Sequence, residues 1–123
     1  MNAEAKIAEL ELQLPPAPKP GGVYQPVLIN GNFAYVSGHG PVLEDESYIV
    51  GRVGSDLDAA AGKNAARQTG LAILASLRVR LGSLDRVKQL VRSFGMVKLL
   101  ERHIVRKIFA LICLIRQQNT ARK

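Results

Sequence analysis

The residues of this sequence that could take part in chemistry are few, and three of them lie between positions 21 and 41. His39 belongs to the glycine-rich segment SGHGP, where a solvated turn residue is the simplest interpretation. Because an imidazole titrates near neutrality, proton transfer is the alternative role for His39. Tyr24 and Ser37 stand among strand-forming residues, and composition alone predicts ordinary strand positions for both. Taken one by one, these three residues therefore do not indicate a function, and a functional interpretation depends on the surrounding motifs.

Other kinds of site are not predicted. His103 and Cys113 are ten residues apart, a spacing that does not place two metal ligands on one helix face. Cys113 is the single cysteine, and we expect it to be a small buried apolar residue. The SGHGP segment lacks the spacing of a phosphate-binding loop. The sequence thus predicts neither a metal nor a cofactor.

Charge and composition change abruptly at residue 98. Residues 1–97 hold 10 Lys/Arg against 9 Asp/Glu, a net charge of +1, whereas residues 98–123 hold 7 against one, a net charge of +6. All 11 glycines and all 6 prolines precede residue 98. The basic segment contains a single aromatic residue, Phe109, so RNA binding by stacking is not favoured. We therefore divide the chain into residues 1–97 and a basic tail, 98–123.

The elements that must position the candidate residues follow from periodicity and turn signals. Helices are predicted over 3–12, 59–81 and 98–117, and strands over 23–29, 32–37 and 87–97. Asn30-Gly31 predicts a tight hairpin turn, Asp56 or Asp58 a helix cap, and Gly82 a helix stop. The chain is expected to be α+β and one small domain. The apolar run IFALICLI is too short to cross a bilayer, and a cytoplasmic location is expected.

Several segments, in order, resemble the Rid/YjgF family of reactive intermediate deaminases, whose members are often labelled endoribonuclease L-PSP. GGVYQPVLINGNFAYVSGHGP at 21–41 resembles the family's glycine-rich turn, hairpin and V-S-G-x-x-P end. Residues 53–97 resemble the following helix and strand. Residues 3–24 reproduce the P-P-A-x-x-P-x-G-x-Y stretch of a subgroup with an extra N-terminal helix. The resemblance covers about residues 3–97.

This resemblance implies a fold, a reaction and a set of pocket residues. The fold would be a chorismate-mutase-like sandwich with helices on one face of a sheet, assembled as a trimer with sites between subunits. The reaction would be hydrolysis of a 2-imino or 2-enamino acid to a 2-keto acid and ammonia, with an arginine clamping the carboxylate. Tyr24 and Ser37 match pocket positions, and His39 stands where the family more often has Gln.

The tail departs from the family pattern. Members continue through an arginine strand resembling R-S-A-V-G-V, whereas this chain reads KLLERHIVRKIFALICLIRQQNTARK after Val97. A frame-shifted tail is favoured over a divergent tail helix, and the domain is expected to be incomplete at its C-terminus. The chain is therefore expected to be an inactive or impaired deaminase. The alternatives are a protein that binds a small ligand, RNA or a partner without catalysis, and attachment of residues 98–117 to a membrane surface.

Overall fold

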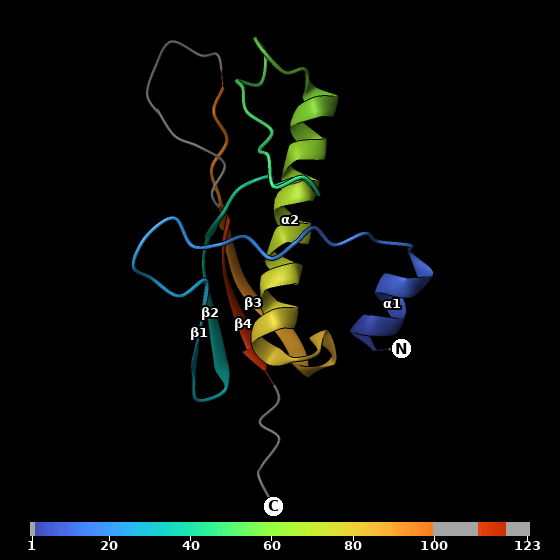
Figure 1. The fold of residues 1–123 in the computed structure, drawn as a ribbon, viewed down its shortest axis with the longest axis vertical. Coiled ribbons are helices and arrows are strands. Elements are labelled where there is room, and N and C mark those ends of the chain that lie inside the picture. The colour runs from blue at the N-terminus through green and yellow to red at the C-terminus, as the bar shows by residue number, and fades with distance from the viewer. Residues whose placement is uncertain (1, 100–110, 118–123) are drawn as a thin grey trace, which may run out of the picture.

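The computed structural model shows a layer of helix packed on one face of an antiparallel sheet (Figure 1). It describes residues 2–99 and 111–117. The helices are α1 (Ala3–Glu9) and α2 (Ala59–Leu81), followed by the 3-10 turn η1 (Leu84–Arg86). The strands are β1 (Val27–Asn30), β2 (Phe33–His39), β3 (Val87–Gly95) and β4 (Leu111–Gln117), in the order β1-β2-β4-β3. The predicted α+β class is confirmed.

A hairpin joins β1 to β2, as the sequence predicts, but the turn is one residue later. Asn30 pairs with Phe33, so Gly31 and Asn32 form the two-residue loop. Gly31 has φ +58°, a backbone conformation that glycine adopts without steric cost. Such a glycine at the first central position suits the twist of two-residue hairpins. The first strand is also shorter than expected, because it begins at Val27 and leaves Tyr24 in the preceding loop.

Helix α2 begins and ends where the capping residues predict. Asp58 is the N-cap, and its Oδ1 accepts from the Ala61 N–H at 2.7 Å. The other candidate, Asp56, instead accepts from the Arg52 N–H at 2.9 Å. Gly82 ends the helix in the left-handed conformation at φ +81°, and its N–H donates to the Arg78 carbonyl at 2.8 Å. Both ends therefore have partners for backbone groups that a helix terminus leaves unpaired.

The buried surface of α2 is wide near the middle of the helix. Ala65 and Thr69 are buried, whereas Ala66 is exposed. From Leu71 to Leu77 nearly every side chain is buried, because the sheet covers one side and the segment after α1 crosses the other (Figure 1). The eight residues of the main core come from α2, the strands and η1: Val27, Ala34, Val36, Ile73, Leu77, Leu81, Leu84 and Ile115.

The prediction of a tail helix over residues 98–117 is wrong where the structure describes this segment. Leu111–Gln117 forms β4, which lies between β2 and β3 and pairs with both. At the start of the segment, the Lys98 carbonyl accepts from the Val53 N–H at 3.0 Å, and Leu99 forms an isolated β-bridge with Val53. In a short apolar run, the spacing of apolar residues does not distinguish a buried strand from a buried helix. The helix was predicted for this reason. Residues 100–110 lie outside the described residues.

The side chain of Ile115 shows that β4 contributes to the core. Ile115 pairs with Ala34 of β2 and with Leu90 of β3, and it is 5% exposed under α2. Part of the basic tail is therefore an internal strand of the sheet.

Within the described residues, no helix is long and apolar enough to cross a membrane.

Candidate functional site

Tyr24 closes the glycine-rich loop before β1. Its hydroxyl accepts from the Gly21 N–H at 3.3 Å, and its side chain is about half exposed. Ser37 and His39 lie on β2, so the three predicted pocket residues come from two neighbouring segments. Among the described residues, no hydrogen bond links Tyr24 to either of the other two. The structure thus links Ser37 to His39 by a hydrogen bond, and Tyr24 is not part of that link.

Ser37 is occupied by the backbone of the segment before β1. Both its N–H and its hydroxyl donate to the Pro26 carbonyl, at 2.9 Å and 3.2 Å respectively. Its own carbonyl oxygen lies 2.8 Å from Nδ1 of His39. The polar groups of Ser37 therefore connect Pro26 to His39 and hold the end of β2 in place.

His39 is buried, so the expectation of a solvated turn residue is wrong. Only 6% of the residue is exposed, and Nε2 lies 2.8 Å from the Ser76 hydroxyl on α2. Both ring nitrogens therefore have protein partners. Burial lowers the pKa of His39 below its ordinary value of 6.5, because desolvation disfavours the charged ring, while the bond to the Ser37 carbonyl opposes this only in part.

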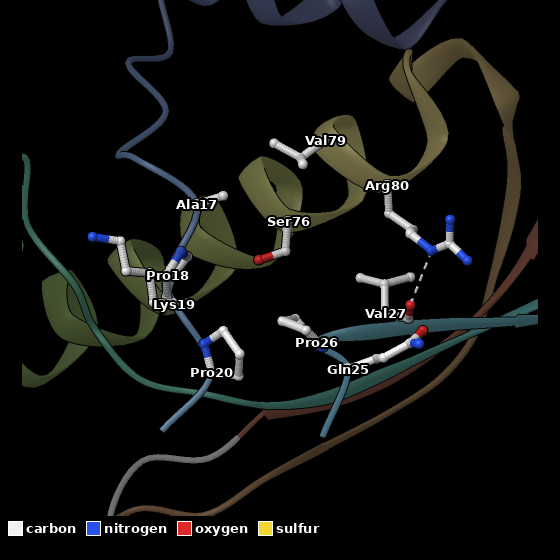
Figure 2. Close-up of a pocket in the computed structure, with 10 residues that line it drawn as sticks. All are labelled: Ala17, Pro18, Lys19, Pro20, Gln25, Pro26, Val27, Ser76, Val79 and Arg80. Carbon is white, nitrogen blue, oxygen red and sulfur yellow. Dashed lines mark hydrogen bonds between the residues drawn. The ribbon is translucent and has the colours of Figure 1, made fainter. Parts of the chain in front are cut away.

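Beside this histidine lies a cavity of about 550 Å³ between the proline-rich segment, α2 and the start of β1. Figure 2 shows the Ser76 hydroxyl on the side of α2 that faces Pro18, Pro20 and Pro26. Most of the wall is apolar. Its lining residues are Ala17, Pro18, Lys19, Pro20, Gln25, Pro26, Val27, Ser76, Val79 and Arg80.

Arg80 is fixed at the edge of this cavity. Its Nε donates to the Val27 carbonyl at 3.3 Å, which ties α2 to β1 (Figure 2). Ser76 and Arg80 are four residues apart and thus share one face of the helix. That spacing was visible in the sequence, but nothing in it pairs Ser76 with His39, which is 37 residues away. Sequence reasoning therefore missed both Ser76 and Arg80.

The metal prediction concerns residues that are only partly described. Over residues 2–99 and the described part of β4, no three His, Cys, Asp or Glu side chains gather to hold a metal ion. His103 and the side chain of Cys113 lie outside the described residues.

Solved structures share this arrangement of helices and strands. A proposed endoribonuclease from Shewanella oneidensis has a TM-score of 0.80 and 20% identity, over 94% of this chain and 99% of that one. The protein Atu1372, of unknown function, from Agrobacterium tumefaciens has a TM-score of 0.77 and 22% identity, over 93% of this chain and 90% of that one. The chain has the Rid/YjgF fold. The sequence resemblance to Rid/YjgF proteins is thus confirmed at the level of the fold.

One curated protein is also similar in sequence. Protein TCP17 of Trypanosoma cruzi is 32% identical over 88 residues, which make up 72% of this chain. The match spans 55% of the length of that protein, so the chain corresponds to little more than half of it. No family model matches the sequence. The comparisons therefore establish the fold, and the resemblance to the Rid/YjgF family in sequence rests on the motifs between residues 3 and 97.

Proposed function

We propose that this chain is a cytosolic Rid/YjgF-family protein related to 2-imino and 2-enamino acid deaminases, with its deaminase activity lost or strongly reduced. In this proposal the fold is of the chorismate-mutase-like kind. The observation that carries the loss of activity is that the polar groups of Ser37 and His39 are bonded within the protein. With these bonds in place, neither residue offers a free polar group to the carboxylate of an imino acid.

Hydrolysis of an imino acid also needs a cation for the substrate carboxylate. The family pattern supplies it from an arginine strand, and this chain has no such motif after Val97. A bidentate guanidinium holds a carboxylate in one orientation, and losing that orientation removes much of the rate enhancement. We attribute the proposed loss to residues 98–123, through a shifted reading frame. Translating the encoding DNA in all three frames tests this cause, since it requires one frame to restore the arginine strand.

The activity itself is tested with imino acids made in place by an amino-acid oxidase. We expect the rate of keto-acid formation with the full chain to equal that without it, after subtraction of spontaneous hydrolysis. The same chain unfolded by heat is the control for protein-dependent artefacts. Turnover well above both controls contradicts the proposal.

A 2-keto acid is proposed to remain a weak ligand near the glycine-rich loop. Tyr24 is half exposed there and its hydroxyl already accepts one hydrogen bond, so it still has a ring face and a donor to offer. We expect Tyr24→Ala to weaken binding of pyruvate in an NMR titration. Unchanged shifts in the wild-type protein on adding pyruvate contradict this part of the proposal.

A trimer is proposed on the basis of the uncovered face of the sheet. The exposed side chains of Leu28 and Tyr35 lie opposite each other on β1 and β2, and those of Phe33 and Phe94 are also exposed. Exposed apolar side chains gathered on one face are typical of an interaction surface. In sedimentation velocity, we expect Tyr35→Asp to dissociate the assembly and the loop variant Val50→Asp to leave it intact. A wild-type protein that sediments as a monomer contradicts the proposal.

A further inference from the structure

The contacts of His39 fix the tautomer of its ring. A carbonyl oxygen only accepts, so the 2.8 Å contact with the Ser37 carbonyl places the proton of the neutral ring on Nδ1. Nε2 is then unprotonated and accepts from the Ser76 hydroxyl, 2.8 Å away. A hydroxyl bonded to an imidazole nitrogen, with a third group orienting the imidazole, is the geometry of an activated serine. Here a backbone carbonyl takes the part of the orienting group.

The protonation state of His39 suits a base at neutral pH. Burial lowers its pKa, so the ring is neutral when the surrounding solution is near pH 7. The imidazole is nearly buried, which keeps water from competing with Ser76 for Nε2. A lower pKa also means a weaker base, and the expected catalysis is therefore modest.

Ser76 lies between this base and the cavity. It is one of the residues that line the space of about 550 Å³, and its hydroxyl faces the prolines on the other wall (Figure 2). Pro18, Pro20 and Pro26 make that wall apolar, which suits an aliphatic acyl chain. One helical turn beyond Ser76, Arg80 uses Nε on the Val27 carbonyl and carries further N–H donors that suit a carbonyl oxygen.

The geometry points to Ser76 and His39 as the nucleophile and general base of a second site, one that hydrolyses small esters with an aliphatic acyl group. Ser76 Oγ bonds to the acyl carbon while its proton passes to Nε2 of His39. The proton then moves to the departing oxygen, so the alcohol leaves and the acyl group stays on Ser76. Water attacks this acyl-serine, gives a proton to His39, and the proton returns to Ser76 Oγ as the acid leaves. The sum is ester plus water giving acid plus alcohol.

This site is independent of imine chemistry and has its own readout. The full chain is treated with a fluorophosphonate probe, which modifies activated serines, and the adduct is located by peptide mass spectrometry. Hydrolysis of p-nitrophenyl butyrate is followed in parallel. We expect an adduct on Ser76, and none on Ser47, an exposed serine whose hydroxyl donates to Asp45.

Variants separate a catalytic role from a structural one. Ser76→Ala removes the nucleophile, and Ser47→Ala is the matched control that should hydrolyse the ester at the wild-type rate. His39→Gln can accept from Ser76 and donate to the Ser37 carbonyl but cannot take up a proton, so it should lower the labelling rate about a hundredfold. A wild-type protein without an adduct on Ser76 overturns the proposal. Ester hydrolysis that persists in folded Ser76→Ala, or undiminished labelling in His39→Gln, overturns it as well.

Discussion

Strands β2 and β3 pair with opposite edges of β4, yet their surroundings differ. On β2, Ala34, Val36 and His39 are buried beneath α2. On β3, every residue from Lys88 to Gly95 is exposed, including the apolar Leu90 and Phe94. The core that α2 covers therefore contains the hairpin and β4 but only the first residue of β3, Val87.

The β1–β2 hairpin and strand β3 are therefore stabilised by different interactions. The hairpin side is stabilised by burial of apolar surface, which contributes roughly 25 cal/mol per Å². β3 is held mainly by backbone pairing with β4 and by anchoring at its start. Its outer edge has no neighbouring strand among the described residues, an arrangement that leaves backbone groups open to a partner. The hairpin thus contributes more of the buried core, whereas β3 contributes an open edge.

The largest expected effect comes from truncating a leucine that packs on the hairpin, in comparison with a leucine on β3. Leu77 is fully buried between α2 and the hairpin, so Leu77→Ala should lower the free energy of unfolding by about 2–5 kcal/mol. Leu90 on β3 is more than half exposed, and Leu90→Ala should change it by about 0.5 kcal/mol or less. Urea unfolding of both variants checks the contrast. Equal losses would show that β3 belongs to the same core.

An intermediate effect is expected where α1 anchors the beginning of β3. The Glu4 carboxylate accepts from the Leu84 N–H at 2.9 Å and from Arg78 at 2.6 Å, while Asp85 accepts from the Glu4 N–H at 2.9 Å. The two bonds to its carboxylate lower the pKa of Glu4, and the one from the Leu84 backbone contributes most. Because Glu4 is partly exposed, Glu4→Gln should cost only about 1 kcal/mol near neutral pH.

Glu9→Gln is the matched control for this anchor. Glu9 pairs with Lys6 at 2.9 Å, but both side chains are about half exposed on α1, so the loss should stay below about 0.5 kcal/mol. Chemical denaturation at pH 7 compares the two variants. The difference should shrink as the pH falls through 4.5, because the Glu4 contribution is present above that value and is lost when the carboxylate is protonated. An equal cost for both variants argues against the anchor.

The effect that is smallest at neutral pH is a pH dependence on the hairpin side, which develops only as the pH falls below 6.5. Because the pKa of His39 is lowered in the folded protein, the unfolded chain binds more protons as the pH falls below 6.5. Wild-type stability should then be complete above pH 6.5 and decline below it, by at most about 1.4 kcal/mol per pH unit. His39→Gln should remove this decline, as measured by unfolding at pH 7.5 and pH 5.5. Parallel curves for the two proteins would contradict a buried neutral histidine.

How far the sequence predicted this structure depended on whether a feature was local. The Asp58 cap, the Gly82 stop and the hairpin turn each depend on residues close together in the chain. The Gly82 stop was predicted correctly, the hairpin turn to within a residue, and the cap as one of two candidates, Asp56 or Asp58. β4 was misassigned, because its strand character comes from pairing with β2 and β3 rather than from its own period. Ser76 was missed for a similar reason, since its partner His39 is distant in sequence.

Amide hydrogen exchange of the full chain tests most directly whether β4 is the internal strand that joins the two sides of the sheet. An internal strand has both edges bonded, so the amides of residues 112–116 should be protected to the same degree as those of Ala34–Val36 on β2. Amides of β3 should exchange faster than both. Rapid exchange throughout residues 112–116, with α2 and the hairpin still protected, would contradict the account.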